Sequence, residues 1–177
     1  MTTDPFDGHD WMSLMGIALL GLILTTSLTA YACTTLTRHG LPLAGPAVWL
    51  RATAALSGAG AIALYAWGAV HLMTFDETSR TDACQHAVGP AHAGDIDGYR
   101  PTYLPLRFGC HVKGGATYDV GVPGYVNPGA LGLGVAAVVL AGLAGLTIWA
   151  GRRRARSAAE ATAEATATGT AAEASGR

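Results

Sequence analysis

Residues 129–150 read GALGLGVAAVVLAGLAGLTIWA, a run of 22 residues without a charged side chain. An α-helix rises about 1.5 Å per residue, so this run is about 33 Å long and matches the roughly 30 Å hydrocarbon core of a bilayer. Residues 11–33 carry no formal charge either, and residues 52–73 contain only Tyr65 and His71 as notable ionisable groups. We therefore predict an α-helical integral membrane protein with transmembrane helices at 11–33, 52–73 and 129–150, embedded in the lipid bilayer.

The composition supports this fold class and excludes several functions. Only 13% of the residues are charged, half are hydrophobic and the net charge is −1, whereas a typical soluble domain is about 25% charged. This balance argues against a disordered chain, a large soluble enzyme and a nucleic-acid-binding protein. Arg supplies ten of the eleven basic residues, Lys113 is the single lysine, and Ala and Gly dominate. Such usage is typical of GC-rich genomes, so we expect a small bacterial envelope protein.

Basic residues predict how the chain threads through the membrane. The segment 1–10 contains three aspartates and no Lys or Arg, whereas the 34–51 connection is basic and the 151–177 segment opens with four arginines. Short basic segments stay in the cytoplasm. We therefore expect a multi-pass protein of the plasma (inner) membrane, with 1–10 and the long 74–128 connection outside and 34–51 and 151–177 inside.

The segment after the third predicted helix divides into two parts. Its basic cluster is expected to stop membrane transfer and to lie near anionic lipid headgroups; it comprises Arg152, Arg153, Arg154 and Arg156. Residues 157–177 contain Ala, Thr, Glu, Gly and Ser but no large apolar residue. Because this tail has nothing to bury, we expect it to be disordered.

An alternative treats the first predicted helix as a cleaved signal. Ala30, Tyr31 and Ala32 resemble a signal-peptidase site, and Cys33 directly after them suggests a lipoprotein. A signal peptide, however, needs a positive n-region, and residues 1–10 are acidic. Cleavage would also place the arginine cluster outside, against the positive-inside rule. We therefore expect the helix to be retained.

Small residues recur at every fourth position in each predicted span. Lipid provides no hydrophobic drive between helices, so such residues favour close backbone packing. The three sets are Gly21, Thr25 and Thr29; Ala55, Ala59 and Ala63; and Ala137, Ala141 and Gly145. In an Ala- and Gly-rich chain these sets do not determine an oligomeric state.

The 74–128 connection contains Cys84 and Cys110, which we expect to form a disulfide because the outer compartment is oxidising. In the chain-entropy model, closing this 26-residue loop contributes about 3–4 kcal/mol. Apolar residues alternate from 104 to 112 and again from 118 to 122, with Lys-Gly-Gly at 113–115 between them. This two-residue period predicts a β-hairpin near 103–123 with Cys110 on its inward face. Asn127 is expected to cap the third helix, with a proline in its first turn.

Three histidines of the outer connection, His86, His92 and His111, suggest an outer-side metal or pH sensor. With reduced thiols, Cys84 and Cys110 would join His86 and His111 as zinc ligand types, but neighbouring residues of a strand point to opposite faces. The spacing matches no familiar zinc pattern, and solvated loop histidines are the simpler interpretation. A thiol-disulfide protein is a further alternative, although catalytic dithiols are normally close in sequence.

No catalytic motif is present, so we expect a non-enzymatic membrane component without a cofactor, whose outer connection contacts a membrane or envelope protein or another ligand. Aromatic residues are enriched in contact patches, while packing into the small outer core or lying at the headgroup level is the alternative for about half of them. The candidate contact residues are Tyr99, Tyr103, Phe108, Tyr118 and Tyr125.

Overall fold

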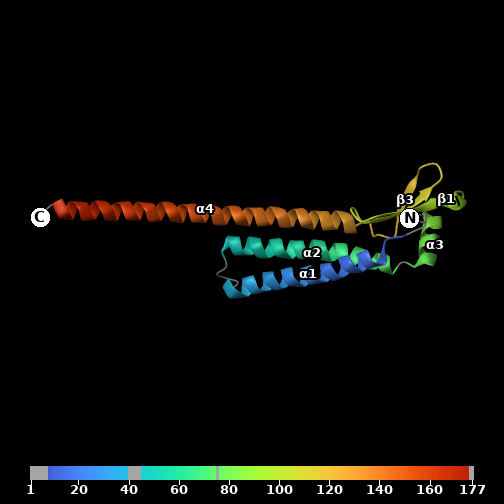
Figure 1. Ribbon diagram of the computed structural model, residues 1–177, viewed down its shortest axis with the longest axis horizontal. Coiled ribbons are helices and arrows are strands. Elements are labelled where there is room, and N and C mark those ends of the chain that lie inside the picture. Colours follow the sequence, from blue (N-terminus) through green and yellow to red (C-terminus); the bar gives the residue numbers. More distant parts are fainter. Residues whose placement is uncertain (1–7, 40–44, 75, 176–177) are drawn as a thin grey trace.

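The computed structural model describes residues 8–39, 45–74 and 76–175. Three long helices run side by side, α1 (Trp11–His39), α2 (Pro46–Met73) and α4 (Val126–Ser175), and a small sheet domain sits at one end of them (Figure 1). Helices α1 and α4 each pack on α2 rather than on each other, so α2 is the central helix. We call the end that carries the sheet domain the sheet end, and the opposite end of α1 and α2 the far end.

All three helices are long and apolar enough to cross a bilayer, over Trp11–Arg38, Pro46–Met73 and Val126–Ala163. The three predicted helices are thereby confirmed, and each is longer than the apolar run that predicted it. Apolar composition locates the part of a helix that fits the hydrocarbon core. It does not locate the ends of the helix, which continues into polar residues as long as its backbone hydrogen bonds are made. Pro46 stands in the first turn of α2, where its missing amide costs nothing and its fixed φ favours the helix.

The tail differs from the sequence prediction. Residues 157–175 continue α4 as one uninterrupted helix, where the composition predicted disorder. Ala and Glu are among the strongest helix formers, and a helix already formed over 126–156 needs no new nucleation to extend. The tail therefore needs no buried apolar face to be helical, because the preceding helix supplies the nucleus. The last two residues lie outside the described part.

Glycines set the spacing of the helices at the α1–α2 and α2–α4 contacts. A Cβ added at Gly21 of α1 would lie 2.6 Å from the Ala66 Cβ, and one at Gly58 of α2 would touch both Leu28 and Ala137. At Gly21 a side chain would push the two backbones apart, whereas at Gly58 a Cβ would only make ordinary contact, 3.7 and 3.8 Å from these neighbours. Small residues therefore allow the close approach. The Thr25 hydroxyl also reaches the Ala59 carbonyl oxygen at 3.5 Å.

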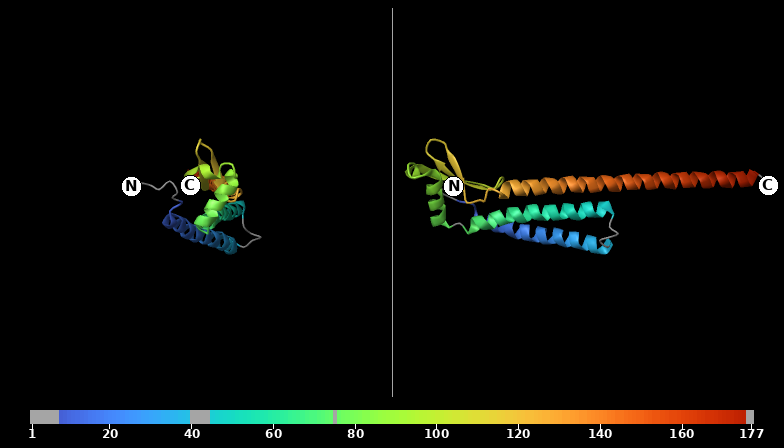
Figure 2. Two further views of the ribbon diagram at one scale, coloured as in Figure 1. Left: turned by 90° about the vertical axis from the view of Figure 1, so that its right-hand side faces the viewer. Right: turned by 180° about the vertical axis from the view of Figure 1, so that it is seen from behind.

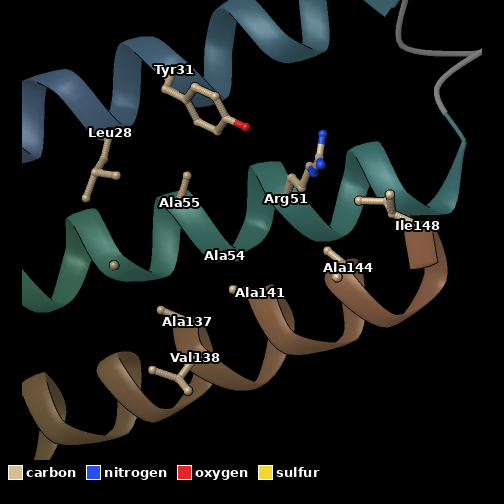
Figure 3. A pocket seen from close by; sticks show the side chains of 12 residues that line it. Leu28, Tyr31, Arg51, Ala54, Ala55, Ala137, Val138, Ala141, Ala144 and Ile148 are labelled. Atoms are coloured by element: carbon tan, nitrogen blue, oxygen red, sulfur yellow. The ribbon is translucent and has the colours of Figure 1, made fainter.

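Part of the predicted small-residue pattern does not form a helix contact. Ala63 is exposed, and Ala141 and Gly145 of α4 face a cavity of about 500 Å³ between α1, α2 and α4. The cavity lies toward the far end and opens because α1 and α4 flank α2 without closing on each other (Figure 3).

The sheet domain (residues 76–125) contains helix α3 (Glu77–Val88), a short 3₁₀ turn at Ala93–Asp95, and strands β1 (Ile96–Thr102), β2 (Arg107–Val112) and β3 (Thr117–Val120). The strands form an antiparallel sheet in the order β1-β2-β3, and α3 lies beside it, turned across the long helices (Figure 2). The β2–β3 pair confirms the predicted hairpin, although 103–106 form a turn rather than its first residues. Strand β1 was not predicted.

Two local signals place these elements. Asp76 caps α3, since its Oδ1 accepts the Ser79 amide at 2.8 Å. Gly114 and Gly115 connect β2 to β3 with φ values of 112° and 102°, which glycine adopts without a Cβ clash. The sequence Lys113-Gly114-Gly115 therefore fixes the hairpin turn as predicted.

One apolar core joins the sheet domain to the sheet ends of α1 and α2. Its buried members come from both parts and include both bridged cysteines: Leu14, Ala69, Leu72, Cys84, Val88, Leu106, Phe108, Cys110 and Val112. Because the core is shared, the sheet domain is held in a fixed orientation on the helices rather than tethered by its two connections.

Candidate functional site in the sheet domain

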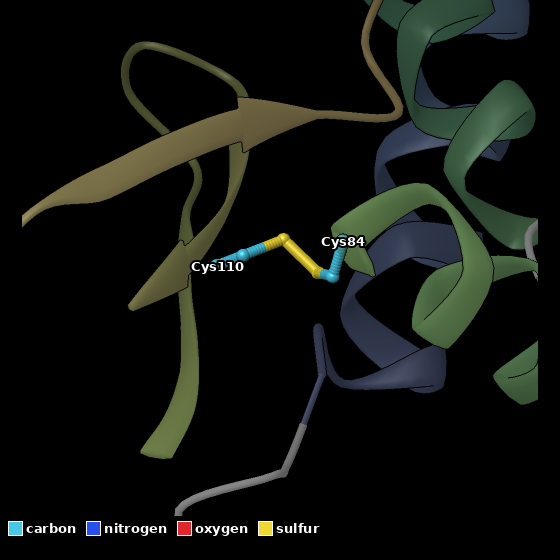
Figure 4. The surroundings of a disulfide bond; sticks show 2 residues. All are labelled: Cys84 and Cys110. Carbon is cyan, nitrogen blue, oxygen red and sulfur yellow. A yellow bond between two sulfur atoms is a disulfide. The ribbon is translucent and has the colours of Figure 1, made fainter. Parts of the chain in front are cut away.

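The disulfide is the covalent centre of the sheet domain. Cys84 of α3 and Cys110 of β2 are bridged with a Cα–Cα distance of 5.8 Å, which confirms the predicted pair (Figure 4). Both residues are fully buried, and Cys110 stands on the inward face of its strand as expected. The bridge holds α3 against the sheet. Cys33, the remaining cysteine, is free and exposed on α1.

The turn between β1 and β2 is the main contact with the helices. Leu106 is fully buried against Gly68 of α2 and against Val126 at the start of α4. The Tyr65 hydroxyl of α2 donates to the Tyr103 carbonyl oxygen. We call this set the junction. It connects the middle of the sheet domain to two of the three long helices.

Asn127 closes the junction from the α4 side. Its side-chain Nδ2 donates to the Leu106 carbonyl at 2.9 Å, and its Oδ1 accepts the Leu106 amide at 3.1 Å. The expected helix-capping role of Asn127 is wrong, because α4 already begins at Val126. The amide group instead pairs with both backbone groups of a buried residue, which would otherwise lack partners at a large cost. Pro128 does lie in the first turn, as predicted.

The residues just before α1 contact the same turn. The His9 Nε2 lies 3.0 Å from the Thr102 carbonyl oxygen, and the ring packs edge-on against Tyr103 with centroids 4.9 Å apart. The Asp10 amide donates to the Tyr103 hydroxyl at 3.2 Å. Burial lowers the pKa of His9 and the nearby Arg80 guanidinium lowers it further, partly opposed by the bond to Thr102. The contact between the N-terminal segment and the sheet therefore favours the neutral form of His9.

The candidate sensing histidines do not come together. His86 pairs with Asp82 at 3.5 Å on α3, and His92 lies 3.4 Å from an Asp95 oxygen at the 3₁₀ turn. Within the part of the chain that the structure describes, no three His, Cys, Asp or Glu side chains are placed to hold a metal ion. Because Cys84 is disulfide-bonded, it cannot act as the thiolate ligand that the zinc interpretation needs.

His111 differs from the other two because it is partly shielded. Its Nδ1 lies 2.5 Å from the Asp97 Oδ1, and its side chain is only 24% exposed, against 81% for His86. The pair crosses from β2 to β1 at the point where a register shift interrupts their pairing, between Ile96 and Gly98. The hydrogen bond from His111 lowers the pKa of the Asp97 carboxyl, and this lowering outweighs the smaller opposing effect of burial.

The five candidate contact aromatics divide into two groups. Phe108 is 2% exposed and belongs to the core, with the Tyr99 ring 5.0 Å away. Tyr103 is half-buried in the junction. Only Tyr118 and Tyr125 keep large exposed surfaces, at 38% and 59%. The core alternative thus describes Phe108, Tyr99 and Tyr103, so an aromatic patch of all five does not exist.

The outward face of the sheet is polar instead. Phe108, Cys110 and Val112 point inward, so the alternate residues of each strand point away from α3. On this face the Arg107 guanidinium forms an ion pair with Asp119 at 2.9 Å. Its remaining side chains come from all three strands: Arg100, Thr102, His111 and Thr117. We call these six residues the outward face.

Gly109 lies in the middle of the outward face. A Cβ there would lie 2.7 Å from the Thr117 side chain and 3.2 Å from the Arg100 carbonyl oxygen. The residue therefore allows the side chains of β1 and β3 to close over β2. This face was not predicted, because its members stand between the apolar residues that predicted the hairpin and share no motif of their own.

The four arginines of the basic cluster at 152–156 are exposed on α4. The Arg153 guanidinium stacks over the Trp149 ring at 3.8 Å from its centroid, an arrangement stabilised by the ring's electron-rich face. Arginine and tryptophan side chains both favour the headgroup level of a membrane. Arg152, Arg154 and Arg156 have no ion pair among the described residues.

Comparison with known proteins adds no assignment: no family model, no curated protein and no solved structure matches this chain.

Proposed function

We propose that this chain is a multi-pass protein of the bacterial plasma membrane, with the sheet domain outside and the α4 tail in the cytoplasm. Three observations support this placement. The helices are long and apolar enough to span, and a disulfide is stable only in an oxidising compartment. The sheet domain and the arginine cluster lie on opposite sides of the apolar run 129–150 of α4, as the positive-inside rule requires.

Within that membrane we propose a non-enzymatic role, in which the helices present the outward face of the sheet to a partner protein. The observation that carries the proposal is the junction: Leu106 and Asn127 fix the sheet to the helices. A rigid mounting reduces the entropy cost of binding. The face combines positive and negative groups, so the matching surface is a polar protein segment with the opposite arrangement of charges.

Thiol labelling tests the placement. Intact cells are treated with a membrane-impermeant maleimide before and after reduction, and again after permeabilisation. We expect Cys84 and Cys110 to react only after reduction, because the disulfide protects them and they face outside, and Cys33 to stay unlabelled in intact cells. Labelling of Cys84 only after both reduction and permeabilisation would invert the orientation.

Photo-crosslinking tests the partner role. A photoreactive residue replaces the exposed Thr117 of the outward face, and in a matched variant it replaces Thr81, an exposed threonine of α3. We expect one adduct of defined mass from position 117 and none from position 81. Exchanging Arg107 and Asp119 (Arg107→Asp with Asp119→Arg) preserves an ion pair but reverses its direction, so it should abolish the adduct. An adduct that survives the exchange, or forms equally at both positions, would contradict the role.

A second candidate, pH sensing, is favoured at one histidine only. His111 is partly shielded and bound to Asp97 across a register shift, whereas His86 and His92 are exposed. Sensing through this pair predicts that His111→Ala abolishes a pH-dependent change in the 117 adduct while His86→Ala leaves it unchanged. Equal behaviour of the two variants would exclude His111 as the sensor.

A further inference from the structure

The cavity between α1, α2 and α4 has an apolar body and one polar end. Its floor is Ala54, Ala55 and Gly58 of α2, and α4 contributes Ala141 and Gly145. Among the described residues that line it, those with polar side chains are Tyr31 of α1 and Arg51 of α2, which extend into the same region at the far end (Figure 3). We call this cavity the far-end groove. Its shape and polarity are those of a site for an amphiphile.

The polar end lies at the depth of lipid headgroups. Tyr31 is 20 residues from Trp11, and Arg51 is 22 residues from Met73, distances of about 30 and 33 Å along their helices. The hydrocarbon core is about 30 Å thick. With Trp11 and Met73 at the sheet-end boundary, both polar residues therefore reach the opposite boundary, while Gly58 lies about 10 Å deeper.

Arg51 has a charge without a protein counter-charge. Among the described residues no carboxylate lies within ion-pair distance of its guanidinium, and residues 40–44 contain no acidic side chain. At the edge of the hydrocarbon a cation is stabilised by an anionic partner. A phosphate matches the guanidinium fork with two parallel hydrogen bonds, and the Tyr31 hydroxyl supplies a further donor beside it.

We propose, on the membrane placement proposed above, that the far-end groove binds an anionic phospholipid. One acyl chain lies along the alanines and glycines of the groove, and Arg51 and Tyr31 bind the phosphate. The groove volume of about 500 Å³ is within the usual range for small-ligand sites.

A helix from a second copy fits the groove less well. A helix is about 10 Å across, much wider than a single acyl chain, so it enters the groove less deeply. An apolar helix would also cover Arg51 and leave its charge unpaired. The unpaired cation is thus the observation that favours a lipid over another copy of this chain.

Native mass spectrometry of the full-length protein, released from micelles, tests the site. The probes are phosphatidylglycerol, which is anionic, and phosphatidylcholine, which carries no net charge, each with the same acyl chains. We expect the wild type to retain one phosphatidylglycerol at least tenfold more strongly than phosphatidylcholine. Arg51→Gln should abolish that preference, and Gly145→Leu should prevent retention of either lipid because its side chain fills the groove.

Two matched variants serve as controls. Arg38→Gln removes an exposed arginine at the same end that does not line the groove. Gly142→Leu adds the same side chain to α4 where an added Cβ meets nothing within 4 Å, at a position that does not line the groove either. Both should retain phosphatidylglycerol like the wild type.

Three outcomes would overturn the proposal: equal retention of the two lipids, unchanged preference in Arg51→Gln, or loss in the controls. A lipid-free dimer that Gly145→Leu converts to monomer would show that a second copy occupies the groove. Alkaline carbonate extraction of the same variants separates this test from the membrane placement. If the wild type is extracted, the placement fails; if all variants stay in the membrane, lipid retention reports on the groove alone.

Discussion

Gly68→Ala is the substitution that tests the junction most directly. A Cβ at Gly68 would lie 2.9 Å from the Leu106 Cδ2 and 2.9 Å from the Val126 Cγ1. Both neighbours are fully buried, so neither side chain can turn into open space. Overpacking of this kind costs about 1–3 kcal/mol, and two simultaneous contacts favour the upper half of that range. The better helix propensity of alanine offsets at most about 1 kcal/mol, which leaves a net loss of about 1–2 kcal/mol.

Hydrogen exchange at the Leu106 amide measures this loss. The amide is bonded to the Asn127 side chain, so it exchanges when the junction opens. A loss of 1–2 kcal/mol corresponds to exchange faster by about 5- to 30-fold. Gly142→Ala, where an added Cβ meets nothing within 4 Å, should leave the Leu106 rate unchanged.

A double variant distinguishes overpacking from a general loss of stability. Leu106→Ala alone should cost about 2–5 kcal/mol, because it leaves a cavity in the core. In the Gly68→Ala background the same change should cost at least about 1 kcal/mol less, since the new methyl group occupies part of that cavity. Strict additivity, wild-type exchange in Gly68→Ala, or equal acceleration in Gly142→Ala would each refute the reasoning.

Three further predictions concern the stability of the sheet domain and of its contact with the N-terminal segment. In each case thermal unfolding of the purified protein in micelles is measured. Replacing Cys84 and Cys110 by alanine should lower the free energy of unfolding by about 2–4 kcal/mol, whereas Cys33→Ala should have no effect. The pKa of His9 is lowered in the folded state, so the unfolded chain takes up this proton first as the pH falls. The contribution of His9 to the free energy of unfolding should therefore be constant above pH ~6.5 and fall below it. His9→Gln should remove this fall. The pKa of Asp97 is also lowered in the folded state. Its stabilising contribution is therefore complete above the unfolded pKa of ~3.9 and is lost as the pH falls through the folded pKa. Asp97→Asn should be less stable than the wild type at neutral pH and should lack this loss of stability in acid.

The sequence predicted the features that depend on a few neighbouring residues or on a compartment. A run such as 129–150 has one stable solution in lipid, because each backbone group must be bonded within its own segment. Gly114 and Gly115 place the hairpin turn, since their positive φ values suit glycine. The disulfide followed from two cysteines in one predicted outer connection. In each case the deciding information lies within one segment of sequence.

Strand β1 could not be predicted in the same way. Its pattern is interrupted at the register shift between Ile96 and Gly98 and contains Pro101, so the two-residue period never runs long enough to be recognised. The strand exists because β2 provides a bonding edge and His111 binds Asp97 across the irregularity. Pairing of this kind is a tertiary effect that overrides local propensity.

The aromatic prediction shows two signals in conflict. Phe108 lies in the same alternating set as Cys110, which indicated an inward position, while its residue type indicated a contact patch. Burial of Phe108 at 2% exposure shows that periodicity was the better guide. Periodicity reports the surroundings of a particular residue in a strand, whereas contact enrichment is an average over many proteins.

The junction was missed because its parts are distant in sequence. His9 contacts a residue 93 positions away, Tyr65 one 38 positions away, and Asn127 one 21 positions away. Gly68 is the residue whose sequence position could have indicated the junction. A glycine near the end of a predicted span is costly for a helix, and it is typical of a close approach by another segment. What approaches it, a leucine from a turn and the first residue of α4, depends on the tertiary fold.

The same contacts explain how α4 stays in place. Between Val126 and Arg156 only Val126 and Ala144 of this helix are fully buried, and toward the far end the groove separates it from α1. Side-chain packing, the main source of helix association in lipid, therefore joins α4 mainly to α2. At the sheet end α4 is attached to the sheet domain as well, because Val126 is buried and Asn127 binds Leu106. It follows that loosening the junction should loosen the start of α4 together with the sheet domain, while the packing on α2 holds the rest of the helix.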